Sequence, residues 1–160
     1  MISALFTLLL LPYTGQESQD ADHQTTVVTA VLLSAGDPAE LVETLLRATG
    51  EGSGIAFPQI MALEPGPLQL DNGLRLLPNQ VSPRLTRPQV MLISTYAPPK
   101  LDDLFVAFLR RCLQDGTHIW LVGPNIPEAL LNFPLEPGQV IRRVPTAQLP
   151  QALRELAPSP

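Results

Sequence analysis

Short apolar runs alternate with amphipathic stretches along most of the chain, from about residue 27 onwards. Apolar runs rich in β-branched residues are typical of strands buried inside a parallel sheet. The predicted strands are Val27–Leu33, Ile55–Leu63, Val90–Ile93, His118–Val122 and Val140–Val144. Pro58 interrupts the second run and favours an edge position for that strand, because proline cannot donate a ladder hydrogen bond. We expect the first, third and fourth strands to be neighbours at the centre of the sheet.

A helix start follows the first predicted strand. Asp37 stands at the expected N-cap, and Pro38 stands at the first helical position. Glu40 completes a capping box with Asp37. Apolar residues then recur at helical spacing until Gly50, which ends the predicted helix. Strand, tight loop and helix make the first half of a βαβ unit.

Three further helices and a hairpin complete the predicted elements. One face of the 101–113 stretch collects the apolar residues Leu101, Leu104, Phe105, Phe108, Leu109 and Cys112. Residues 125–128 repeat the capping-box arrangement before a short helix through Leu131, and residues 149–156 form a last amphipathic helix. Asp71-Asn72-Gly73 is a hairpin turn within residues 68–77. The pattern predicts an α/β fold with a three-layer, doubly wound (flavodoxin-like) sheet, mostly parallel, and a small β-hairpin.

The 160 residues are enough for one domain with its own core. We place a single α/β domain at residues 25–158 and a separate segment at residues 1–24, where the apolar run Ile2–Leu11 precedes a polar linker. The run has the length of a signal-peptide hydrophobic region and is too short to span a bilayer. We therefore favour an exported or periplasmic location over a cytoplasmic one, with the segment either cleaved or kept as an anchor. The alternative is a strand or helix that covers the domain.

Charge and cysteine content exclude several classes of function. The net charge is -5, and ten Lys and Arg residues are scattered without a basic stripe, so we expect no direct binding of nucleic acid. Cys112 is the only cysteine, which excludes an internal disulfide. His23 and His118 lie far apart and lack the spacing of zinc ligands. We expect neither a metal site nor a cofactor.

Four stretches of the sequence resemble the DJ-1/PfpI branch of the class I glutamine amidotransferase-like fold. They are Thr29–Thr49 (TAVLLSAGDPAELVETLLRAT), Gly73–Pro78 (GLRLLP), Gln89–Ser94 and Leu101–Val122. The resemblance covers roughly residues 27–125 and is strongest to the ligand-sensing domain of AraC-type transcription regulators. It implies the same doubly wound fold.

The chain departs from this family where catalysis is expected. The family carries a nucleophilic cysteine at a turn that matches Gly123-Pro124-Asn125, which has no thiol. Its backbone oxyanion donors match Ser94–Pro99, where prolines have no N–H to donate. Glu43 matches the family's acidic residue on the first helix, and Cys112 lies on an apolar helix face as a small buried residue. The resemblance therefore implies a degenerate, non-catalytic member, a pseudoenzyme.

Parallel α/β sheets bind ligands beyond the carboxyl ends of their strands. The ligand-binding candidates at that rim, together with Glu43, are Gly36, Asp37, Glu43, Ser94, Thr95, Tyr96, Gly123 and Asn125. Their hydroxyls, amide and open backbone suit a small polar ligand, and we assign no catalytic residue. The function predicted is a small-molecule-binding or protein-interaction module.

Two alternatives remain open at this point. The first is a hydrolase or lyase-type enzyme of the same fold, in which Ser94, Thr95 or Tyr96 works with His118 or Glu43. The second is a structural module that forms a homodimer through the 101–113 helix.

Overall fold

The computed structural model describes residues 26–50, 52–80, 87–97 and 99–157. A six-stranded sheet lies at its centre in the order β5-β2-β1-β6-β7-β8, and every neighbouring pair is parallel. The strands are β1 (Thr29–Leu32), β2 (Gln59–Ala62), β5 (Asn79–Gln80), β6 (Val90–Ser94), β7 (His118–Val122) and β8 (Ile141–Arg143). A separate antiparallel hairpin pairs β3 (Leu68–Gln69) with β4 (Arg75–Leu76). The predicted α/β class, parallel sheet and hairpin are confirmed.

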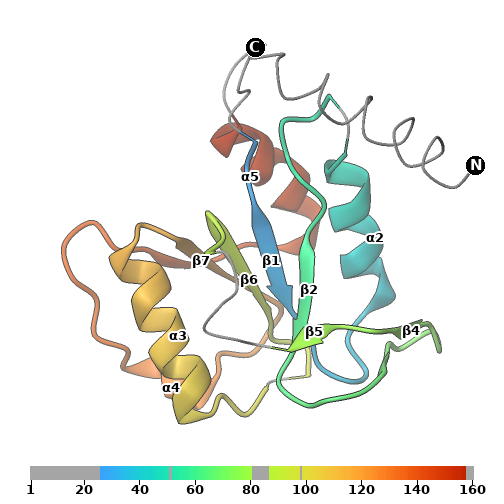
Figure 1. Cartoon of the computed structure of the whole chain (residues 1–160), viewed down its shortest axis with the longest axis horizontal. Helices are drawn as coiled ribbons and strands as arrows, with labels where there is room; N and C mark the ends of the chain where they lie inside the picture. Colours follow the sequence, from blue (N-terminus) through green and yellow to red (C-terminus); the bar gives the residue numbers. More distant parts are fainter. Residues whose placement is uncertain (1–25, 51, 81–86, 98, 158–160) are drawn as a thin grey trace, which may run out of the picture.

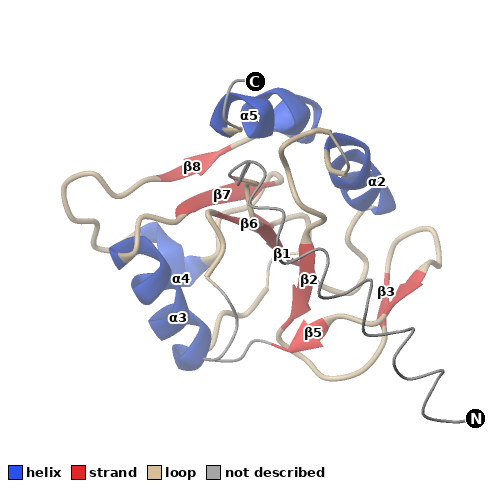
Figure 2. Cartoon of the chain, turned by 45° about the horizontal axis from the view of Figure 1, so that its top comes forward, coloured by secondary structure: helices blue, strands red, loops and turns tan. Residues whose placement is uncertain are grey.

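Helices cover both faces of the sheet (Figure 1). One layer holds α2 (Ala39–Ala48) and α5 (Leu149–Leu156). A short 3-10 helix (Thr146–Gln148) comes directly before α5. The opposite layer holds α3 (Asp103–Gln114) and α4 (Glu128–Leu131). Figure 2 shows the two pairs of helices on either side of the strands. The three layers are those of a doubly wound fold.

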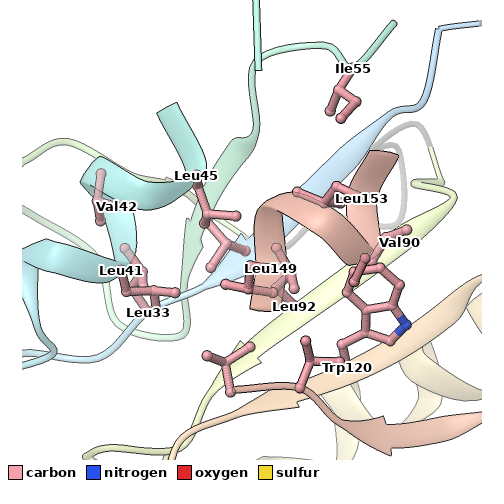
Figure 3. Close-up of a cluster of buried hydrophobic side chains, with 14 of the residues drawn as sticks. Leu33, Leu41, Val42, Leu45, Ile55, Val90, Leu92, Trp120, Leu149 and Leu153 are labelled. Atoms are coloured by element: carbon pink, nitrogen blue, oxygen red, sulfur yellow. The ribbon is translucent and has the colours of Figure 1, made fainter. Parts of the chain in front are cut away.

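Two hydrophobic cores lie on the two faces of the sheet, because successive strand residues point in opposite directions. Leu92 and Trp120 belong to the core beneath α2 and α5, where Leu45 and Leu149 lie close to them (Figure 3). Ile93, the residue after Leu92, belongs instead to the core beneath α3. Strands buried on both faces explain why their sequences are continuously apolar.

The central strands lie where the sequence predicts, since β1, β6 and β7 adjoin. The edge assignment for the second strand is wrong. Pro58 precedes β2 instead of interrupting it, and β2 pairs with β1 on one side and β5 on the other. The edge strand β5 lies between the hairpin and β6, where the sequence predicts no strand. Its two residues are too few for a periodic signal.

Neither predicted capping box forms. The first residue of α2, Ala39, donates its N–H to Oδ1 of Asp71 at 2.9 Å, while the side chain of Asp37 turns away from the helix. The short helix α4 also begins without a side-chain cap, and the amide of Asn125 binds elsewhere. Leu104, expected on the buried face of α3, is 59% exposed.

The membrane and N-terminal predictions have different outcomes. No helix among the described residues combines the length and apolar character needed to cross a bilayer. The Ile2–Leu11 run lies outside the described residues, and its export role remains a prediction.

Candidate functional site

A cleft of about 620 Å³ lies beyond the carboxyl ends of β1, β2 and β6. Three segments line it, namely residues 33–35 after β1, residues 62–68 at and after the end of β2, and residues 97, 99, 100 and 102 before α3. The chain leaves β1 towards β2 and returns as β6 on the other side of β1, so the cleft lies at the topological switch point. Ligands of doubly wound sheets bind at that point, and a volume of about 300–1,000 Å³ suits small molecules.

The lining of the cleft is mixed in chemistry. Leu33 and Leu68 contribute apolar surface, and the exposed side chains of Glu64, Lys100 and Asp102 contribute charge. Oδ1 of Asp102 accepts the N–H of Phe105 at 2.7 Å and caps α3. Within the described ranges, neither Glu64 nor Lys100 forms an ion pair, so both charges are available to a bound molecule.

Asp37 joins two walls of this cleft. Its Oδ2 accepts the N–H of Ser34 at 2.7 Å, and its Oδ1 accepts the N–H of Ala97 at 3.1 Å. Ser34 follows β1 and Ala97 follows β6, and both line the cleft. The side chain of Asp37 is fully buried. The carboxylate therefore fixes the relative position of two loops that are 60 residues apart in the chain.

The environment of Asp37 favours its neutral form. Burial raises the pKa of the carboxyl above its ordinary value, because removal from water disfavours the charge. The hydrogen bonds from Ser34 and Ala97 act in the opposite direction and only partly offset burial. The hydroxyl of Ser94 also lowers the pKa of Asp37, although Oγ of Ser94 has no hydrogen-bond partner of acceptable geometry among the described residues.

The β3–β4 hairpin docks on the same loop. The N–H of Asp71 binds the carbonyl of Asp37 at 3.0 Å, and the N–H of Gly36 binds the carbonyl of Gln69 at 2.9 Å. With the cap that Asp71 gives to Ala39, three hydrogen bonds hold the hairpin against the start of α2. Leu68, the first residue of the hairpin, lines the cleft, so this docking positions a third wall.

The turn after β7 is tightly packed at Gly123, the position that the sequence resemblance matches to an elbow cysteine. Gly123 has φ +134°, which L side chains rarely adopt. A Cβ there would lie 2.6 Å from Oγ1 of Thr95 and 2.8 Å from the backbone N of Tyr96. No side chain fits this backbone without a shift, so the turn excludes a nucleophile by shape as well as by residue type.

Polar contacts seal the loops around Gly123. The side-chain amide of Asn125 donates to the carbonyl of Thr95 at 3.0 Å. Arg143 donates to the carbonyls of Gly123 and Pro124 at 3.2 and 2.8 Å. The hydroxyl of Tyr96 lies 2.9 Å from that of Thr146. Hydrogen bonds thus join the loops after β6 and β7 to each other and to the end of β8.

The residues named for the alternative enzyme function lie apart from one another in the structure. His118 opens β7 opposite Val90, whereas Ser94 lies opposite Val122 at the far end of the ladder. Four residues of strand span about 13 Å, so Ser94 and His118 are not within hydrogen-bond reach. Glu43 is exposed on α2, where its carboxylate pairs with Arg47 at 3.8 Å.

Cys112 is also remote from any candidate chemistry. The residue is fully buried in the core beneath α3, as predicted. Burial raises the pKa of its thiol, which disfavours the reactive thiolate. The described part of the chain contains no group of three or more His, Cys, Asp or Glu residues suited to a metal ion.

The predicted ligand-binding residues fall into separate places. Asp37 is buried behind the lining of the cleft. Ser94 and Thr95 are also fully buried, and Glu43 is exposed on α2. Tyr96, Gly123 and Asn125 come together at the turn after β7. None of the eight candidates lines the 620 Å³ cleft, and Gly36 lies one residue beyond its lining. The loop at residues 62–68 and the Lys100 segment were not among the candidates.

No protein-family model and no curated protein matches the sequence. Solved structures do match the fold. An AraC family transcriptional regulator from Pseudomonas putida is 15% identical, with 82% of this chain and 86% of that chain covered and a TM-score of 0.52. DJ-1beta from Drosophila melanogaster is 18% identical, with coverage of 61% and 55% and a TM-score of 0.42. A ThiJ/PfpI family protein from Pseudomonas syringae is 16% identical, with coverage of 66% and 46% and a TM-score of 0.44.

These likenesses concern the fold. This chain spans about half the length of the Drosophila and P. syringae proteins, and most of the P. putida one. The resemblance stated from the sequence, to the DJ-1/PfpI group and the sensing domain of AraC-type regulators, is confirmed as a likeness of fold.

Proposed function

We propose that this chain is a non-catalytic domain of DJ-1/PfpI-like fold that binds a small polar molecule in the cleft beyond β1, β2 and β6. The observation that carries the proposal is the cleft itself. It is open at the topological switch point, and its volume suits a small ligand. Buried hydrogen bonds of Asp37 hold two of its walls, so the site exists before a ligand arrives.

Three observations favour binding over turnover. Gly123 carries no nucleophile and sits in a turn that a Cβ would overfill. The thiol of Cys112 is buried, and its raised pKa keeps it protonated. His118 lies at the opposite end of the sheet from the cleft. A nucleophile and its base act together, so these separations leave no constellation for the family's reaction.

The lining indicates the kind of ligand. Leu33 and Leu68 offer apolar contact, and the available charges of Glu64 and Lys100 offer polar contact on different walls. A small molecule with an apolar part and at least one polar group fits this mixture.

The proposal is tested by thermal denaturation in the presence of a library of small polar metabolites. A ligand at one hundred times its Kd stabilises the folded state by about 2.7 kcal/mol, so a binder raises Tm measurably. Ala35→Trp is designed to block the site, because Ala35 is exposed and lines the cleft. Ala107→Trp, at an exposed position of α3, is the matched control.

We expect at least one compound to raise the Tm of the parent and of Ala107→Trp but not of Ala35→Trp. Mass spectrometry of that compound after prolonged incubation should recover it unchanged. Equal stabilisation of both tryptophan variants would place the ligand elsewhere, and a modified compound would show the protein to be an enzyme.

The interaction role remains a prediction. Leu104 on α3 is exposed instead of buried, so this helix offers an apolar residue to solvent. Light scattering of the parent and of Leu104→Asp would test the predicted homodimer. A monomeric parent would contradict it.

A further inference from the structure

We propose that Asp37 is the positioning residue of the cleft, and that its ionised carboxylate sets the spacing between the wall after β1 and the wall after β6. The proposal rests on the binding role of the cleft for its biological meaning, but the positioning itself is testable without a ligand. This role explains why the acidic side chain of Asp37 is buried, although it neither caps a helix nor lines the cleft.

The geometry supplies the first argument. Each oxygen of the Asp37 carboxylate accepts one backbone N–H, Oδ2 from Ser34 at 2.7 Å and Oδ1 from Ala97 at 3.1 Å. Both donors belong to residues that line the cleft. The carbonyl of Asp37 also accepts the N–H of Asp71 from the hairpin. One buried residue thus bonds to the loop after β1, to the loop after β6 and to the hairpin.

The chemistry of the carboxyl group supplies the second argument. An ionised carboxylate is an acceptor at both oxygens, so it can satisfy both N–H groups. A protonated carboxyl carries an O–H donor on one oxygen, and that oxygen becomes a weaker acceptor than in the carboxylate. Uptake of a proton therefore weakens one of the two bonds and loosens one wall. The raised pKa of Asp37 brings this change closer to neutral pH than for an exposed aspartate.

Other titratable groups around Asp37 are in different situations. Glu40 on α2, Asp71 on the hairpin, and Lys100 and Asp102 at the rim of the cleft are all exposed. The carboxylate of Asp71 accepts the N–H of Ala39, and that of Asp102 accepts the N–H of Phe105. Among the described residues in this region, Asp37 is the carboxylate that accepts N–H groups from two walls of the cleft.

The first test is a pH titration of backbone amides by ¹H–¹⁵N NMR on the whole chain. The amide protons of Ser34 and Ala97 should shift together, with a common midpoint above the ordinary pKa of aspartate. Asp37→Asn should abolish that shared titration, because the amide cannot ionise and presents a donor to one N–H. Asp102→Asn is the matched control, a carboxylate at the same cleft that accepts a bond only from its own helix.

The two variants should differ in one respect. Asp37→Asn should abolish the shared pH-dependent shift of Ser34 and Ala97, whereas Asp102→Asn should leave it in place. Independent midpoints for Ser34 and Ala97, or their survival in Asp37→Asn, would overturn the proposal. If Asp37→Asn fails to fold, the titration of the parent still decides the matter, because the two amides either share a midpoint or do not.

The second test measures the wall spacing. Spin labels at Glu64→Cys and Lys100→Cys report the distance across the cleft, and the buried Cys112 should remain unlabelled. The distance distribution should be narrow at neutral pH and broaden below the Asp37 midpoint, and Asp37→Asn should be broad throughout. A distribution independent of pH and of Asp37 would refute the positioning role. If the metabolite screen finds no ligand but the wall spacing depends on Asp37 as expected, the proposed binding function fails and the positioning role of Asp37 stands.

Discussion

Replacing Gly123 with alanine places one methyl group at the most crowded turn of the sheet. The added Cβ would meet Oγ1 of Thr95 at 2.6 Å and the backbone N of Tyr96 at 2.8 Å. The second contact is with backbone, which a rotamer change cannot relieve. The carbonyls of Thr95 and Tyr96 are also held by the side chain of Asn125, so the loop has little freedom to move away.

Two costs add at Gly123. Holding a non-glycine residue in a sparsely populated backbone region costs about 1–3 kcal/mol. Overpacking a closely packed site costs about 1–3 kcal/mol more. The free energy of unfolding should therefore fall by roughly 2–6 kcal/mol, a large share of the roughly 5–15 kcal/mol typical of a domain.

Urea denaturation of Gly123→Ala measures this loss, and Gly138→Ala is its control. Gly138 also has positive φ, at +87°, but a Cβ there meets no atom within 4 Å. The control should show only the backbone cost of about 1–2 kcal/mol. If both variants lose the same stability, the turn at Gly123 is not packed against Thr95 and Tyr96, and the argument that it excludes a nucleophile fails.

Three further predictions concern single side chains. Cys112 should resist iodoacetamide in the native protein and react only as fast as the chain unfolds; rapid native labelling would contradict its burial. Asp71→Ala should lose about 0.5–2 kcal/mol in urea denaturation, because Ala39 loses the acceptor that caps α2; an unchanged midpoint would show the cap to be unimportant. The pKa of Asp37 is raised in the folded state. Its stabilising contribution to the free energy of unfolding is therefore complete below the pKa of the unfolded state, and it is lost as pH rises through the pKa of the folded state. Across that window the stability of Asp37→Asn relative to the parent should rise with pH, and a constant difference would contradict the shift.

Much of the fold could be predicted because its signals are local and redundant. The central strands are apolar on both faces, and helical spacing between them leaves few arrangements other than a doubly wound sheet. The capping assignments were wrong because a carboxylate can accept hydrogen bonds from N–H groups other than those of the helix that follows it. Asp37 accepts the N–H of Ala97, which comes from a loop that no local pattern connects to it. Asp71, distant in sequence, supplies the cap instead.

The sequence places its candidates at the carboxyl ends of the strands, and the cleft lies at that same edge but is lined by other residues. The sequence assigns β2 to an edge and names no candidate in the loop that follows it. In the structure β2 lies inside the sheet, and its loop, residues 62–68, lines the cleft. The candidates beyond β6 and β7 form tight contacts with one another, an arrangement that depends on the approach of Gly123 to Thr95 and is invisible in sequence.

The most direct test of the binding proposal is the map of amide shift changes when the best compound of the metabolite screen is added. The account predicts that the changes concentrate at Ser34, at the non-proline residues of 62–68, and at Ala97, Lys100 and Asp102, with the compound recovered unchanged. Changes concentrated instead around Gly123 and Asn125, or conversion of the compound to a product, would contradict it.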